Sequence, residues 1–126
     1  MQDEPTPTEL IKAVADFLRN DIVPTISGHN AFKLRVSINA LDLVTRQLAL
    51  ASRSDAAEAA RLSQLLAIQG SLTELNRALA DRIAKGEFDL QTPGLAEHLW
   101  QTTMAKLAVD QPNYGSYKRE LGQSKP

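Results

Sequence analysis

Residues Asn30 to Ser52 read NAFKLRVSINALDLVTRQLALAS, and the rest of the predicted fold is built around them. On a helix with about 100° between residues, its apolar side chains fall on two separate faces. One face holds Ala31, Leu34, Ile38, Leu41, Val44 and Leu48, and the other holds Phe32, Val36, Leu43 and Leu50. A helix that is apolar on two sides is expected to be buried among its neighbours. The stretch therefore predicts a central helix around which the rest of the chain packs.

A polar strip separates these two faces. It consists of Arg35, Asn39, Asp42 and Arg46, which fall within a sector about 60° wide. Between two packed faces these side chains would be partly buried and would need partners. In the structural interpretation, they pair with one another and with neighbouring helices. In the functional interpretation, the guanidinium groups and the amide hold a carboxylate or phosphate. The strip also fits an ordinary exposed polar face, or a patch on which a partner docks.

Start and stop signals divide the chain into five predicted helices. Capping boxes open two of them, with Thr6 and Glu9 at the first start and Ser71 and Glu74 at the fourth. The remaining boundaries come from Ser54-Asp55 and Thr92-Pro93 as starts, and from Pro24, Gly70, Gly86 and Pro112 as stops. The predicted helices cover about residues 7–23, 30–52, 55–69, 72–85 and 93–109, followed by a partly irregular tail over about 111–126.

The predicted fold class is all-α, a compact bundle of about five helices around the central helix, with no sheet. A chain of 126 residues is long enough for one domain with its own core, so residues 1–126 are expected to form a single helical domain. The only strand-like alternation is at Phe88 and Leu90. Because it has no pairing partner, we interpret it as a loop anchored by these two side chains.

Composition argues against several classes of partner and location. The 14 Lys and Arg residues nearly balance the 15 Asp and Glu residues, so a nucleic-acid partner is not expected. No apolar run approaches the roughly 20 residues that cross a bilayer, so no membrane association is expected. The chain has no cysteine, and its first residues are acidic where a signal peptide would be basic. These features predict a cytoplasmic protein.

The sequence contains no catalytic constellation. His29 and His98 are the only histidines, and neither has a second ligand at a metal-binding spacing. We expect both rings to be solvated, and we expect no catalytic residue, no metal and no cofactor. Trp100 and Met104, four residues apart on the fifth predicted helix, are expected to fill the core, although they also fit the edge of a ligand pocket.

Two segments carry a resemblance to a known family. They are RVSINALDLVTRQL at residues 35–48 and KLAVDQPNY at residues 106–114, with residues 62–66, 72–76 and 83–89 between them. In combination they resemble a small bacterial domain family of unknown function, over most of residues 1–115. Members are usually encoded beside aminoglycoside-phosphotransferase-like kinases and acyl-CoA dehydrogenases, which implies an accessory role in acyl-CoA or related catabolism. The resemblance supplies no activity and no catalytic residue.

Two functions remain open at this point. The first is a non-enzymatic helical accessory or interaction protein, homodimeric, that binds a phosphotransferase-like or acyl-CoA dehydrogenase partner. Its support is the absence of a catalytic motif together with more apolar helix surface than a monomer of this size readily covers. The alternative is a small-molecule binding domain or enzyme subunit for an anionic, acyl-CoA-like ligand. In that case Arg35, Asn39, Asp42 and Arg46 form the site.

Overall fold

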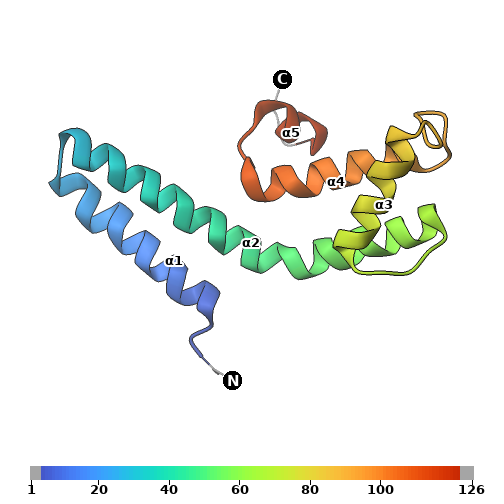
Figure 1. The fold of residues 1–126 in the computed structure, drawn as a ribbon. Helices are drawn as coiled ribbons and strands as arrows, with labels where there is room; N and C mark the ends of the chain where they lie inside the picture. Colours follow the sequence, from blue (N-terminus) through green and yellow to red (C-terminus); the bar gives the residue numbers. More distant parts are fainter. Residues whose placement is uncertain (1–3, 123–126) are drawn as a thin grey trace. The chain divides into compact units, whose positions relative to one another are not determined.

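The computed structural model describes residues 4–122, and its regular elements are all helical. A π-helical turn, Leu18–Ile22, and a 3-10 turn, Val23–Thr25, precede the longest helix. No strand occurs within the described residues, so the predicted all-α class is confirmed. The α-helices of this part of the chain are α1 (Pro7–Phe17), α2 (Gly28–Leu66), α3 (Leu72–Ala84), α4 (Leu95–Asp110) and α5 (Gly115–Glu120) (Figure 1).

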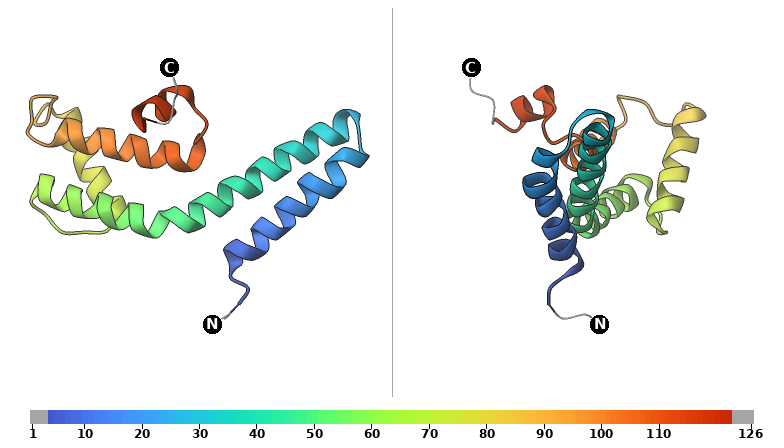
Figure 2. Two further views of the ribbon diagram at one scale, coloured as in Figure 1. Left: turned by 180° about the vertical axis from the view of Figure 1, so that it is seen from behind. Right: turned by 90° about the vertical axis from the view of Figure 1, so that its left-hand side faces the viewer.

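The chain divides into two compact units, with the boundary after Leu50. The first unit holds α1 and the beginning of α2, and the second holds the end of α2 with α3, α4 and α5. Two further views follow α2 as one unbroken helix (Figure 2).

The predicted division of this helix into 30–52 and 55–69 is wrong. The helix continues through Ser54 and Asp55 and ends at Leu66. Between Gly28 and Gly70 there is neither glycine nor proline, and alanines surround the expected break, so nothing forces the helix to stop. The next residue, Ala67, has a left-handed φ of 55° and follows the last helical residue, three positions before the glycine expected to close the helix.

The first unit is a helical hairpin. The predicted capping box starts α1: Thr6 donates its backbone N–H to Glu9 Oε2 at 2.7 Å, and the Glu9 N–H returns a bond to Thr6 Oγ1 at 3.3 Å. Regular α-helix ends at Phe17 rather than at residue 23, and π-helical and 3-10 turns lead through Pro24. A proline has no N–H and crowds the preceding turn, so an ordinary α-helix does not continue there.

The hairpin buries few large side chains. Its buried residues are Ala15, Ala31 and Ile38. The second predicted face of α2 is exposed, with Phe32 at 62% and Val36 at 51%, and Leu43 and Leu50 are also exposed. The expectation that both faces of this helix are packed within the chain is therefore wrong for the second face. The first face is packed only in part, because Val44 and Leu48 are also exposed.

The second unit contains the hydrophobic core. Leu62 and Leu66 at the end of α2 meet Leu75 and Leu79 of α3 and Leu95 of α4. The predicted box between Ser71 and Glu74 opens α3, which places its two leucines toward this cluster. Phe88 packs against the core as expected, and the guanidinium of Arg82 lies 5.3 Å from its ring centroid. Leu90 does not anchor the loop, because it is 73% exposed.

The start of α4 differs from the prediction. Thr92 does not cap a helix at residue 93; its hydroxyl accepts the N–H of Asp89 at 2.9 Å within a turn. The helix begins after Gly94, which has φ 87°. Its buried face holds Leu95, His98 and Val109, whereas Leu99 and Trp100 are exposed. The expectation that Trp100 fills the core is therefore wrong, whereas Met104 is half-buried. The reason is that α4 has apolar residues on more than one side and the core uses a different side.

The tail is partly regular. Gly115–Glu120 forms α5, within a segment expected to be partly irregular, and residues 123–126 lie outside the described residues. No helix within residues 4–122 is long and apolar enough to cross a membrane.

Candidate functional site

The four residues of the polar strip differ in exposure and in the contacts that they make. Arg35 and Asn39 are exposed, whereas Asp42 and Arg46 are half-buried. Arg35 and Asn39 line a shallow pocket of about 250 Å³ in the first unit, together with Arg19, Val23 and Ile38.

Asp42 forms an ion pair with Arg19 across the hairpin. Arg19 Nη2 donates to both of its carboxylate oxygens, at 2.8 and 2.6 Å. The same guanidinium reaches Asp16 through Nη1 at 2.9 Å, and Lys12 also pairs with Asp16. The bond to Asp42 raises the pKa of Arg19. This pair joins the π-helical turn to α2, which agrees with the structural interpretation for this one member of the strip.

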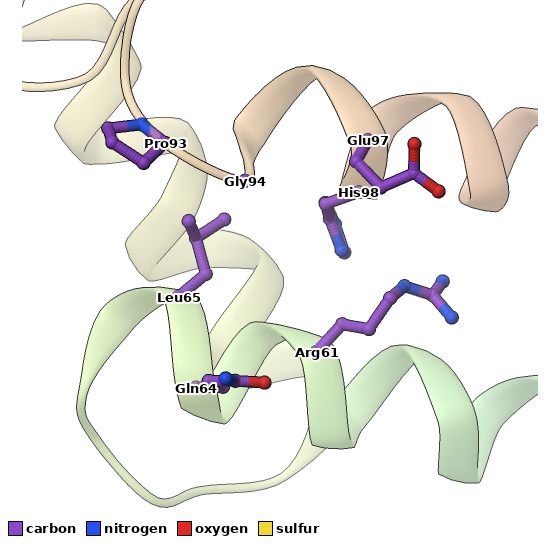
Figure 3. A pocket seen from close by; sticks show the side chains of 7 residues that line it. All are labelled: Arg61, Gln64, Leu65, Pro93, Gly94, Glu97 and His98. Atoms are coloured by element: carbon purple, nitrogen blue, oxygen red, sulfur yellow. The ribbon is translucent and has the colours of Figure 1, made fainter.

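A second cavity lies within the second unit and contains none of the predicted residues. Its volume is about 400 Å³. In Figure 3 the ring of His98 projects from α4 toward α2, while Arg61 rises from α2 toward α4. Gly94, the N-cap of α4, lies at the same opening, and a Cβ built there would lie 3.6 Å from Leu65 Cδ1. The lining consists of Arg61, Gln64, Leu65, Pro93, Gly94, Glu97 and His98.

His98 is a buried polar residue, contrary to the expectation of a solvated ring. Only 3% of it is exposed, and its Nδ1 atom has no hydrogen-bond partner among the described residues. Burial lowers the pKa of His98, and the positive charge of Arg61 lowers it further, whereas Glu58 acts in the opposite direction. The ring is therefore neutral at physiological pH.

Arg61 is half-buried and only weakly engaged. Its Nη2 donates to Thr102 Oγ1 at 3.3 Å, and its buried Nε has no partner in the described part of the chain. No ion pair within residues 4–122 involves Arg61. Glu97, which lines the same cavity, accepts a hydrogen bond from Gln101. A guanidinium beside a neutral imidazole thus leaves hydrogen-bonding atoms without a partner among the described residues in the wall of this cavity.

A neighbouring cavity extends this region along α4. Its volume is about 430 Å³, and it shares Arg61 and Glu97 with the first. Trp100 and Met104 line it. Trp100 is 49% exposed, so it is not the core residue expected from sequence, and the alternative position at a pocket edge describes it better.

Sequence reasoning missed Arg61 and His98 because the residues that surround them are distant in the chain. Arg61 and its partner Thr102 are 41 positions apart. One signal was available: His98 lies three residues after Leu95, on the side of α4 that the core uses. A histidine on the packed face of a helix needs a partner or a cavity.

Comparison with known proteins identifies a family without assigning a function. No curated protein matches the chain, and no solved structure matches it. The family model for a domain of unknown function, DUF6285, matches residues 24–114. The match covers the end of the hairpin turn, all of α2, α3 and α4, and the segment before α5. The chain therefore belongs to the DUF6285 family.

Proposed function

We propose that this protein is a non-enzymatic helical interaction protein that forms a homodimer through its N-terminal hairpin. The observation that carries the proposal is the apolar surface of the first unit. Ten large apolar side chains there are between 36% and 62% exposed. They are Leu10, Val14, Phe17, Ile26, Phe32, Val36, Leu43, Val44, Leu48 and Leu50, and we call them the hairpin surface.

The hairpin surface leaves large apolar side chains in contact with water. Burial of apolar area stabilises an assembly by roughly 25 cal/mol per Å², so covering these side chains would favour association. By contrast, the hairpin itself buries only Ala15, Ala31 and Ile38. A second layer of helices would supply the core that two helices alone lack.

The spacing of the exposed residues favours a second copy of the chain as the occupant. Val36, Leu43 and Leu50 recur every seven residues, which is the repeat of a seam between two helices. Asn39 lies between the first two and has both donor and acceptor groups, so it complements an identical surface. Two-fold dimers with identical patches are the commonest assemblies of soluble proteins.

The test is the mass in solution of the wild type and of Val36→Glu with Leu43→Glu. Wild type is expected at twice 13.8 kDa. The double variant is expected as a monomer with unchanged helix content, because both positions are exposed in the single chain. Leu90→Glu is the matched control, since Leu90 is 73% exposed but lies in the other unit, and it should remain a dimer. A monomeric wild type, or a dimeric double variant, would overturn the proposal.

We further propose that the dimer serves a kinase-like or acyl-CoA dehydrogenase partner in a catabolic system. The support is the resemblance described above, in which such enzymes are the usual neighbours. Co-expression with the products of adjacent genes, followed by purification through a tag on this chain, tests the assignment. Recovery of neither enzyme at stoichiometric amounts would contradict it, while leaving the dimer to be judged by its own experiment.

A second candidate function is the binding of an anion at Arg35 and Asn39. It is favoured by the pocket that these residues share with Arg19, although the charge of Arg19 is already balanced by Asp16 and Asp42. Thermal shift against CoA esters and nucleotides tests it. A ligand at 100 times its dissociation constant stabilises the fold by about 2.7 kcal/mol. An equal shift in Arg35→Ala would exclude this site.

A further inference from the structure

The two cavities along α4 form a candidate ligand site that the proposed dimer does not use. They lie wholly within the second unit, have volumes of about 400 and 430 Å³, and share Arg61 and Glu97. Small-molecule sites in proteins typically measure about 300–1,000 Å³. The residues that line the two cavities have the chemistry of a ligand site.

Two buried donor positions in the first cavity are unpaired within the described residues. They are Nδ1 of His98, a residue 97% buried, and Nε of Arg61. Buried polar atoms in folded proteins nearly always have a partner, and one left without a partner is unfavourable. A neutral imidazole can carry its proton on Nδ1, so both atoms are hydrogen-bond donors without an acceptor from residues 4–122 in the wall of the cavity. Figure 3 shows the two side chains approaching each other from opposite helices.

The charge of the site favours an anion. Arg61 has no carboxylate partner among the described residues, and Arg53 lines the adjoining cavity. Gly94 and Pro93 place the N-terminal end of α4, with its partial positive charge, at the first cavity. The only acidic residue in either lining is Glu97, which is hydrogen-bonded to Gln101. A guanidinium and one ring nitrogen suit the two oxygens of a carboxylate.

Apolar walls define the rest of the ligand. Leu65 and Pro93 flank the first cavity, and Ala57, Trp100 and Met104 line the second. We propose that the second unit binds a small organic carboxylate. Its carboxylate is held by Arg61 and His98, and its apolar part lies in the adjoining cavity against Trp100 and Met104.

The chain contains its own reporter, because Trp100 is its single tryptophan and lines the second cavity. Hexanoate and hexanamide are suitable probes: they share a tail and differ in charge, and neither absorbs where tryptophan does. Titration of the full chain with hexanoate should give a saturable change in tryptophan fluorescence. Hexanamide and inorganic phosphate should not. An equal response to hexanamide or to phosphate, or no response to hexanoate, would overturn the proposal.

Two variants locate the carboxylate. Arg61→Gln removes the charge and should weaken hexanoate binding about tenfold or more, the scale of one hydrogen bond to a charged group. Arg77→Gln is the matched control, since Arg77 is an exposed arginine of α3 in the same unit and lines neither cavity. It should bind hexanoate as the wild type does. Unchanged binding by Arg61→Gln would place the carboxylate elsewhere and overturn the assignment.

The role of His98 is tested in the wild-type chain, because a substitution at this buried position could itself disturb folding. Nitrogen chemical shifts of the imidazoles are followed by NMR as hexanoate is added. The Nδ1 resonance of His98 should move in proportion to the fluorescence change, while the resonances of His29, in the other unit, stay fixed. A fluorescence change without movement of the His98 resonance would overturn the proposed contact.

Discussion

His98 shows how one buried side chain makes stability depend on pH. Its ring is shielded from water and faces the positive charge of Arg61, so protonation is unfavourable in the folded chain. The negative charge of Glu58 opposes this effect, but Glu58 also accepts a hydrogen bond from Asn76 Nδ2 at 2.8 Å. In the unfolded chain, His98 titrates with the ordinary histidine pKa of about 6.5. The unfolded state therefore takes up a proton at a higher pH than the folded state.

The free energy of unfolding should fall as the pH falls from about 6.5 toward the lower pKa of folded His98. In that pH window the unfolded chain binds more protons than the folded chain. The stability that neutral His98 contributes is therefore complete above the window and is lost as the pH falls through it. Urea unfolding at about pH 7.5 and about pH 5.5, on either side of the ordinary value, measures the difference. His98→Gln should reduce the difference between the free energies of unfolding at the two pH values. Equal differences in wild type and His98→Gln would contradict the assignment.

At the scale of elements, α3 depends on a local capping box. Ser71 donates its backbone N–H to Glu74 Oε2 at 2.8 Å, and the Glu74 N–H donates to Ser71 Oγ at 3.3 Å. The bond from the Ser71 N–H, and a second one from the Ser71 hydroxyl to the same oxygen at 2.7 Å, lower the pKa of Glu74. Since α3 carries Leu75 and Leu79 into the core, fraying at its start weakens packing throughout the second unit.

Ser71→Ala should lower the free energy of unfolding by about 1 kcal/mol, the usual cost of losing a cap hydroxyl. Chemical denaturation followed by circular dichroism measures it. Ser52→Ala is the control, because Ser52 is an exposed residue in the interior of α2, where alanine is the better helix former. A loss as large in Ser52→Ala as in Ser71→Ala would show that the cap is not the cause.

The same elements show what sequence could predict. The starts of α1 and α3 were predicted correctly because a capping box is a contact between residues three positions apart. The break expected at Ser54 was wrong because serine and aspartate tolerate a helix interior when no glycine or proline stops the chain. The prediction of which face of α4 is buried was also wrong for Trp100. Helix periodicity gives two candidate faces, and only the tertiary packing selects the one with Leu95 and His98.

The contacts of the candidate site residues also separate into those that the sequence could predict and those that it could not. The sequence located Arg35 and Asn39 together, and they do share a pocket, because their spacing of four fixes them on one side of a helix. The sequence did not predict the ion pair between Arg19 and Asp42, or the approach of Arg61 to His98 and Thr102. Those contacts depend on how separate helices pack, which residue spacing does not encode.

At the scale of the whole molecule, the buried apolar residues are unevenly distributed between the two units. The second unit holds the cluster formed by Leu62, Leu66, Leu75, Leu79 and Leu95. The first unit buries two alanines and one isoleucine and leaves the ten side chains of the hairpin surface partly exposed. Few buried apolar contacts imply a low free energy of local opening. In a single chain, therefore, α1 should open more readily than α3.

If the hairpins of two chains associate, the difference in local opening between α1 and α3 should depend on protein concentration. A partner that binds the folded hairpin stabilises it by mass action, so protection of α1 amides against hydrogen exchange should increase over about a hundredfold rise in concentration. Amides of α3 serve as the internal reference, because their protection comes from packing within the chain. Val36→Glu with Leu43→Glu should show weak α1 protection at every concentration. If wild-type α1 is equally protected at both extremes while the chain stays monomeric, then the two-helix hairpin is stable alone and the hairpin surface needs no second copy.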